Sequence, residues 1–340
     1  MSLSGKDLVL SRFDGRIEER VPVLPLFQSF FANKMAGIKT YDARRCPHKV
    51  AMAQIELMEA CRFDGIDTGV DGLAPIEACG SGVIFPTFGL PYTRFPAITD
   101  AEKLDMMDIP DPINDMRLQP SLTAAEEMVK EIGNDSFTQA SLCGPITIAG
   151  ELMGLGRFIE AIGRDDETIG KLLTFTVEVF KRYIDEYFRL DVDAFAFAEP
   201  VCSADYLSDN DFEKYALPGI VDCIDHMKRS GKMSVIHMCG GSERMIEHVA
   251  GTAIDGICTE LDVSKLPERV HEKTVIGTIS YEHLASRNDH RVMKEALRCI
   301  DSMNNCKHIL ASGDIIPMTT DIHSLKTLRY ASEYHVLNER

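Results

Sequence analysis

Short runs of apolar and β-branched residues alternate along the chain with longer stretches whose apolar residues recur at helical intervals. Runs that are apolar at successive positions are typical of strands covered on both faces, as in a parallel sheet. The stretches between them predict helices that bury one face. Eight strand-like runs occur: Val21–Phe27, Asp64–Val70, Phe137–Leu142, Ala194–Ala198, Met233–Met238, Ile254–Thr259, Thr274–Ile279 and His308–Ala311.

Three of the helical stretches have recognisable ends. One begins near Asp166 and buries apolar residues as far as Tyr187. A second begins at Ser208, whose hydroxyl can cap a helix, and ends before Gly231, a residue type that commonly follows a helix. The last begins at about Asp321. Residues 1–19 predict a helical extension ahead of the first strand.

Eight strands that alternate with helices predict parallel βαβ units, and the number eight favours a closed (β/α)8 TIM barrel over an open sheet. An open nucleotide-binding sheet would carry a glycine-rich phosphate loop, but Gly80-Ser81-Gly82 lacks the rest of that pattern. The segment from Glu77 to about Ser121, rich in proline and glycine, predicts a long excursion over the barrel mouth. We therefore expect one α/β domain over residues 1–340.

Composition limits the classes of function. Hydrophobic residues make up 45% of the 340 residues and charged residues 26%, which is typical of a globular protein. No apolar run is long enough for a membrane helix and no secretion signal is recognisable, so we expect a cytoplasmic protein without a membrane partner. The net charge of −17 argues against a nucleic acid partner. Ten scattered cysteines without a CxxC motif predict free thiols in a reducing compartment.

Polar residues follow several of the later strands. In a barrel the carboxyl ends of all strands meet at one rim, where the chemistry of this fold is carried out. Residues far apart in the chain would therefore lie close together there. These residues are Glu199, His237, Cys239, Glu260, Thr278, Ser280 and Asp314.

His237 and Cys239 form the most informative pair. Residues i and i+2 of a strand point to the same side, and an imidazole nitrogen with a thiolate sulfur suits Zn²⁺. A catalytic zinc needs three protein ligands and an open position, and Glu260 and Asp314 are the candidates for the remaining ligands. The alternatives are a buried histidine bonded to backbone, a cysteine acting as a small apolar residue, and carboxylates that cap turns.

Three further carboxylates, Asp71, Glu77 and Glu199, are candidates for general acid or base catalysis at the rim. The alternative is that they are ordinary acids at the surface or at the start of helices. Cys143-Gly144-Pro145 indicates a strand that turns into a helix rather than a nucleophile.

The chain resembles the uroporphyrinogen decarboxylase superfamily, and within it the methylcobamide:coenzyme M methyltransferase branch. The resemblance extends from about Arg20 onward and implies a TIM barrel. It is carried by Phe63-Asp64-Gly65, Glu77-Ala78-Cys79-Gly80, Cys143-Gly144-Pro145-Ile146-Thr147 with Gly154, Glu199-Pro200 with Leu207-Ser208, His237-Met238-Cys239-Gly240 and Leu310-Ala311-Ser312-Gly313-Asp314 through Pro317.

The resemblance implies zinc bound by the histidine and cysteine of the HxCG element, a glutamate and a last cysteine. His237 and Cys239 match, Glu260 lies close to the glutamate position, and Asp314 replaces the cysteine. That replacement puts coenzyme M in doubt as the methyl acceptor and suggests another corrinoid-dependent member of the group. The absence of arginine from residues 26–31, together with the negative charge, disfavours a porphyrinogen as substrate.

The resemblance thus implies a zinc-dependent methyltransferase that moves a methyl group between methylcobamide and a small thiol or a methoxylated or methylated molecule. The corrinoid would be carried by a partner protein, because the chain lacks a DxHxxG cobalamin-binding element. Two alternatives are a metal-free decarboxylase acting on a tetrapyrrole through Asp71 or Glu199, and a non-catalytic barrel that binds a corrinoid protein. The direction of transfer and the formation of a homo-oligomer stay open.

Overall fold

The structure is a computed structural model that describes residues 3–16, 20–69, 71–164, 167–304 and 306–339. Several expectations fall in part outside these ranges. They concern Val70 at the end of the second run, Asp166 at the start of a helix, and residues 1–2 and 17–19 of the helical extension.

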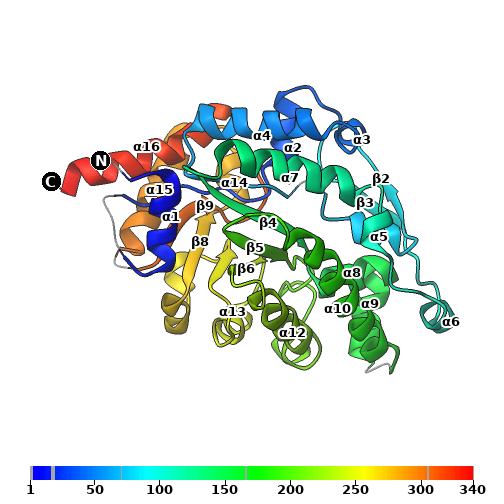
Figure 1. Cartoon of the computed structure of the whole chain (residues 1–340). Helices are drawn as coiled ribbons and strands as arrows, with labels where there is room; N and C mark the ends of the chain where they lie inside the picture. The colour runs from blue at the N-terminus through cyan, green and yellow to red at the C-terminus, as the bar shows by residue number, and fades with distance from the viewer. Residues whose placement is uncertain (1–2, 17–19, 70, 165–166, 305, 340) are drawn as a thin grey trace.

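A curled parallel sheet forms the centre of the molecule (Figure 1). Its seven strands follow the order β1-β4-β5-β6-β7-β8-β9, and each neighbouring pair is parallel. A separate antiparallel hairpin pairs β2 with β3. The strands are β1 (Gly65–Asp67), β2 (Gly82–Ile84), β3 (Tyr92–Phe95), β4 (Phe137–Cys143), β5 (Ala194–Ala198), β6 (Met233–Met238), β7 (Gly256–Thr259), β8 (Thr274–Ile279) and β9 (His308–Ser312).

Helices cover the outer side of the curled sheet (Figure 1). The α-helices are α1 (Gly5–Phe13), α2 (Ser29–Met35), α3 (Thr40–Ala43), α4 (Pro47–Cys61), α5 (Ala74–Ala78), α6 (Ala101–Asp105), α7 (Leu118–Ile132), α8 (Pro145–Met153), α9 (Leu155–Gly163), α10 (Glu167–Tyr187), α11 (Asp209–Asp211), α12 (Leu217–Lys228), α13 (Glu243–Ala250), α14 (Tyr281–Ala285), α15 (Asp289–Ser302) and α16 (Ile322–Glu339). Shorter helical turns are η1 (Pro112–Asn114), η2 (Phe212–Ala216), η3 (Val263–Lys265) and η4 (Glu268–Glu272).

Seven of the eight predicted runs are strands of this sheet, which confirms the α/β class with a parallel sheet. The first run, Val21–Phe27, forms only one parallel bridge, between Val23 and Leu310. The Val23 carbonyl also accepts a hydrogen bond from the Asp64 amide at 2.9 Å. Because Pro22 and Pro25 have no N–H group, this segment cannot form a continuous ladder. It is therefore not the full strand that its composition predicts.

The apolar core lies on both faces of the sheet. Along β5, Phe195 and Phe197 belong to the larger cluster, whereas Ala194 and Ala196 belong to a smaller inner cluster. Val9 of α1 joins this inner cluster, and Phe13 stacks on Phe137 with ring centroids 5.8 Å apart. The predicted N-terminal helix therefore packs into the sheet interior.

The predicted excursion contains the β2–β3 hairpin, α6 and η1 before the chain enters α7. Its Leu90 and Pro91 line the cavity described below. No helix in the described part of the chain is both long and apolar enough to cross a membrane.

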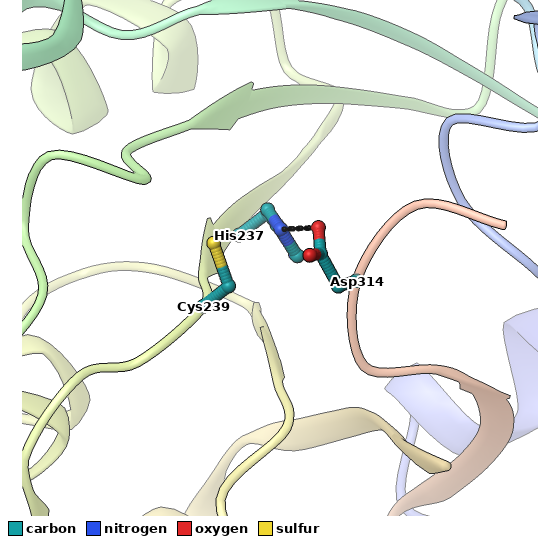
Figure 2. A group of neighbouring side chains, drawn as sticks. All are labelled: His237, Cys239 and Asp314. Carbon is teal, nitrogen blue, oxygen red and sulfur yellow. Dashed lines mark ion pairs between the residues drawn. The ribbon is translucent and has the colours of Figure 1, made fainter. Parts of the chain in front are cut away.

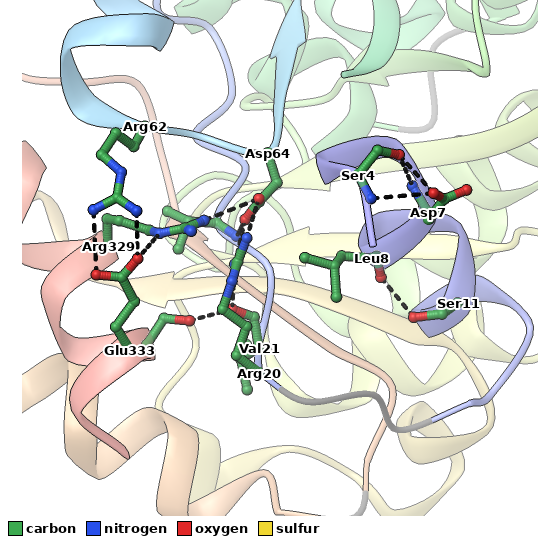
Figure 3. A network of polar contacts seen from close by, with 12 residues as sticks. Ser4, Asp7, Leu8, Ser11, Arg20, Val21, Arg62, Asp64, Arg329 and Glu333 are labelled. Atoms are coloured by element: carbon green, nitrogen blue, oxygen red, sulfur yellow. Dashed lines mark hydrogen bonds and ion pairs between the residues drawn. The ribbon is translucent and has the colours of Figure 1, made fainter. Parts of the chain in front are cut away.

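A buried ion-pair network joins segments from opposite ends of the chain (Figure 3). The Asp64 carboxylate accepts hydrogen bonds from Arg20 Nη1 at 2.7 Å and from Arg329 Nη1 at 3.0 Å. It also accepts the Val23 amide at 2.8 Å. Arg329 in turn contacts Glu333 on the next turn of α16. The network thus holds residues 20–23, the start of β1 and α16 together.

Candidate functional site

β6 positions the predicted pair of metal ligands. His237 lies near the carboxyl end of this central strand, and Cys239 follows directly after the strand. The His237 side chain is only 3% exposed, whereas Cys239 is half-buried. The turn after them uses Gly240 with φ +71°, where an added Cβ would lie 2.5 Å from Ser203 Oγ. The two side chains are therefore held at the mouth of the sheet.

Asp314 joins this pair from the loop after β9 (Figure 2). His237 Nε2 and Asp314 Oδ1 lie 3.4 Å apart, and the ligand atoms of His237, Cys239 and Asp314 all lie within 4.8 Å of one another. β7 and β8 lie between β6 and β9 in the sheet, so the curl of the sheet brings these residues together. Gly313 permits the approach, because a Cβ there would lie 2.6 Å from Glu260 Cα.

The His237 ring is oriented by two neighbours. Its Nδ1 lies 3.2 Å from Cys258 Sγ, on the paired residue of β7, and the Phe27 ring packs edge-on at 4.9 Å between centroids. This leaves Nε2 facing Asp314. Sequence reasoning missed Cys258. This residue belongs to a predicted strand and lies two positions before Glu260, so the alternation of strand side chains places both on the same side.

The electrostatics of the cluster depend on burial and on one carboxylate. Burial raises the pKa of the Cys239 thiol to about 12, with further contributions from Asp314 and Glu260. Burial alone would raise the pKa of Asp314, but its hydrogen bond to His237 lowers it overall. Asp314 Oδ1 also accepts the Ile315 amide at 2.7 Å, so the predicted turn cap is present as well.

The donor set fits a zinc ion. One nitrogen, one sulfur and one oxygen donor converge, which is the ligand chemistry that Zn²⁺ favours. With zinc–ligand bonds of about 2.0 to 2.3 Å, ligand atoms in a tetrahedral site are about 3.3 to 3.8 Å apart. Small side-chain adjustments would bring the three groups to that spacing and leave a fourth position for a substrate.

Glu260 lies beside this cluster rather than in it. Among the described residues, the group of converging ligand atoms contains His237, Cys239 and Asp314. Burial raises the pKa of Glu260, and the nearby Asp314 charge raises it further. Its ligation of a metal would require a different side-chain conformation.

Asp71 and Glu77 are joined by an arginine that sequence reasoning missed. Arg117 donates from Nε to Asp71 Oδ2 at 2.7 Å and from Nη1 to Glu77 Oε2 at 2.8 Å. Its side chain is only 6% exposed. Asp71 lines the cavity, whereas Glu77 does not. No motif marks Arg117, which lies about forty residues further along the chain, at the start of α7.

Glu199 caps the first turn of α8 from a neighbouring segment and does not line the cavity. Its buried carboxylate accepts the Ile146 amide at 3.0 Å, the Thr147 amide at 2.8 Å and the Thr147 hydroxyl at 2.7 Å. Burial raises the pKa of Glu199 to about 7, against the lowering effect of these bonds. The predicted turn after Cys143 is confirmed, since β4 ends at Cys143 and α8 begins at Pro145. The assignment of Glu199, Asp71 and Glu77 as catalytic stays a prediction.

A cavity of about 290 Å³ opens beside the three-residue cluster. Segments from α2, the excursion and the ends of several strands form its walls. The lining residues are Phe27, Ser29, Phe30, Gly69, Asp71, Gly72, Leu73, Leu90, Pro91, Ser141, Leu142, Cys143, Ala198, Pro200, His237, Cys239, Asp314 and Ile315.

Two curated relatives are methyltransferases. Methylcobamide:CoM methyltransferase MtaA from Methanosarcina barkeri is 24% identical over 284 residues, which cover 80% of this chain and 79% of the relative. Methylcobamide:CoM methyltransferase MtbA from Methanosarcina acetivorans is 24% identical over 169 residues, covering 49% and 50%. The predicted resemblance to this branch is confirmed, and the chain is a methyltransferase.

Solved structures share the fold. A methyltransferase from Methanosarcina mazei superposes with a TM-score of 0.87 at 19% identity, covering 98% of this chain and 99% of that one. A B12-independent methionine synthase from Shewanella sp. W3-18-1 gives a TM-score of 0.57 at 12% identity, covering 86% and 88%. The model of the uroporphyrinogen decarboxylase (URO-D) family matches residues 4–334. Since this match spans nearly the whole sequence, the chain belongs to the uroporphyrinogen decarboxylase family.

Proposed function

We propose that this chain is a zinc-dependent methyltransferase that moves a methyl group between a corrinoid carried by a partner protein and a small molecule. The observation that carries the proposal is the convergence of His237, Cys239 and Asp314 within 4.8 Å at the wall of a cavity. The names of the curated relatives supply the corrinoid part of the proposal.

The residues of the cluster have separate roles in this proposal. Cys258 and Phe27 hold the imidazole so that Nε2 faces the cluster, and Asp314 supplies an oxygen donor from the loop after β9. A zinc ion bound there would supply Lewis acidity, which would lower the pKa of a substrate thiol or polarise an ether oxygen. A thiol substrate would lose its proton to solvent as it accepts the methyl group from the partner protein's corrinoid.

The size of the cavity supports a corrinoid presented from outside. Pockets for small ligands are typically about 300 to 1,000 Å³, and this cavity of about 290 Å³ lies at the lower limit. The cavity can hold one small molecule, but it has no room for a corrin ring in addition. A corrinoid held by a partner protein would therefore have to cover the mouth of the cavity.

We also infer that the sheet closes into an eight-stranded barrel through residues 22–24. The Val23–Leu310 bridge on one side and the hydrogen bond from the Asp64 amide to Val23 on the other support this closure. The match to residues 4–334 supports a single domain.

The proposal is tested by metal analysis of the purified protein. We expect about one zinc per chain, lost in the His237→Ala/Cys239→Ala double variant while the melting temperature is retained, because the barrel core supplies the stability. Asp314→Ala should lower zinc affinity at least about tenfold, since one of three ligands is lost. Asp205→Ala, an exposed control beyond the cavity lining, should keep its zinc.

A methylcobalamin demethylation assay with a panel of thiols and methoxylated compounds completes the test. Full zinc retention in Asp314→Ala would remove this residue from the ligand set. Protein that holds no zinc and transfers no methyl group would contradict the proposal and favour the metal-free alternatives.

A further inference from the structure

The cavity beside the three-residue cluster contains no lysine or arginine among its described lining residues, and its histidine, His237, faces Asp314. Its walls are mainly apolar and include Phe27, Phe30, Leu73, Leu142 and Ile315. The ionisable acids in the lining are Asp71 and Asp314, both negative when charged. An anionic ligand would therefore meet apolar walls and carboxylates, without a lysine or arginine to pair with it.

Two arginines close to the cavity are already engaged with carboxylates. Arg117 bonds to both Asp71 and Glu77, and its side chain is 6% exposed. Arg44 lies at a small neighbouring cavity that shares Phe30, Asp71 and Pro91 with the main one. Its Nη1 is 3.9 Å from Glu77 Oε2, and its guanidinium also lies over an aromatic ring. Neither arginine presents a free charge to the main cavity.

The acids are equally unavailable to a cationic ligand. Arg117 neutralises Asp71, and Asp314 faces His237 within the cluster. Burying a charged group without a partner is strongly unfavourable, so an ionic ligand buried in this cavity would bind weakly. The electrostatics therefore favour a ligand without charge beyond the reacting atom.

The volume of the cavity sets the size of this ligand. An engineered apolar protein cavity of about 150 Å³ binds benzene. The present cavity of about 290 Å³ is nearly twice as large. A single ring with a methoxy, methylthio or thiol substituent fits this space.

We propose that the small molecule which donates or accepts the methyl group is uncharged, largely apolar and about the size of one substituted ring. This inference rests on the proposed function. It assigns a substrate class to the same cavity and predicts that thiols bearing a sulfonate or carboxylate are poor substrates.

Binding to zinc-free protein tests the inference without reference to activity. The probes are anisole, 4-methoxybenzenesulfonate and 4-methoxyphenyltrimethylammonium, which share one ring and differ in charge. Ligand-detected NMR should show anisole binding at least about tenfold more tightly than either ion. Equal or tighter binding of an ion, or no saturable binding of anisole, would overturn the inference.

A variant that adds a positive charge to the cavity rim tests where the probes bind. Leu90 lines the rim and is 42% exposed, so it tolerates a polar substitution. Leu90→Arg should increase sulfonate affinity at least about fivefold, whereas the matched Leu90→Gln should not. Unchanged sulfonate binding in Leu90→Arg would show that the probes bind elsewhere and would overturn the assignment to this cavity.

Methyl-transfer assays separate the two proposals. If zinc-loaded protein methylates 2-sulfanylethanesulfonate faster than ethanethiol, the substrate class is wrong while the methyltransferase proposal stands. If it holds no zinc and methylates neither thiol, the proposed function fails. The binding preference of the zinc-free protein still decides whether the cavity selects uncharged ligands.

Discussion

Two buried histidines at strand positions have different surroundings in this sheet. His237 places Nε2 towards Asp314 and Nδ1 towards Cys258, both polar side chains. His308 at the start of β9 instead contacts the Gly277 carbonyl through Nε2 at 2.8 Å. Its Nδ1 has no hydrogen-bond partner among the described residues, so the ring is held by one backbone bond within the core. The neighbours of the ring, rather than its burial, therefore distinguish a candidate ligand from a packing residue.

His308 should make stability depend on pH. Burial lowers the pKa of His308 to about 4, whereas an unfolded histidine has a pKa of about 6.5. The unfolded chain therefore binds the proton first, and stability present above pH 6.5 is lost as the pH falls towards 4. The loss from this residue is at most about 3 kcal/mol. His308→Gln should flatten this part of the profile in urea unfolding measured from pH 7.5 to 4.5, whereas the exposed control His48→Gln should not. An unchanged slope in His308→Gln would contradict the assignment.

At the scale of elements, the residue after one strand caps the helix that follows the neighbouring strand. α8 has Gly144 at its N-cap, without a side chain to cap the first turn. The Glu199 carboxylate after β5 performs this role across the sheet. An added Cβ at Gly144 would lie 2.3 Å from Glu199 Oε1, so glycine is required for this approach. The beginning of α8 thus depends on the β4–β5 register.

Removing this cap should destabilise the fold without affecting the metal. Glu199→Ala leaves two buried amides and one hydroxyl without their acceptor, and should lower the free energy of unfolding by about 2 to 3 kcal/mol. Thr147→Val removes only the hydroxyl bond and should cost about 1 kcal/mol. Chemical denaturation measures both losses, and zinc content should not change. Retained stability with loss of methyl transfer in Glu199→Gln would instead favour the predicted catalytic role.

At the scale of the whole molecule, Asp64 connects parts of the chain that are remote in sequence. Arg20 precedes the first strand-like segment and Arg329 lies on the last helix, and both pair with this carboxylate (Figure 3). All three side chains are largely buried, at 14%, 13% and 3% exposure for Arg20, Arg329 and Asp64. The network therefore stabilises the place where the two ends of the sheet approach one another.

Asp64→Ala should therefore be strongly destabilising. It would leave the buried Arg20 guanidinium without its anion and Arg329 with Glu333 alone, and should cost about 3 to 5 kcal/mol. The exposed pair of Arg16 and Asp14 offers a control, because Asp14→Ala should cost less than about 1 kcal/mol. Thermal and urea unfolding compare the two variants. Similar small losses in both would show that the network contributes little to stability.

Local sequence pattern was sufficient for most of the strands and for two of the three residues in the cluster. Strand residues alternate in direction, so the spacing of His237 and Cys239 alone put both side chains on one side of β6. Continuous apolar runs likewise predicted seven strands correctly, because strands buried on both faces need apolar residues at successive positions. The remaining run, Val21–Phe27, is also apolar, but its prolines limit it to one bridge.

Contacts between distant segments required the tertiary structure. The sequence offered both Glu260 and Asp314 as partners for His237, and only the curl of the sheet brings Asp314 rather than Glu260 into the cluster. Arg117 and Cys258 were missed for the same reason, since each contacts a site residue that lies on a different segment of the chain. Periodicity reports which face of an element is buried. The distance between side chains on different elements depends on how the sheet curls and how closely residues such as Gly313 let its strand ends approach.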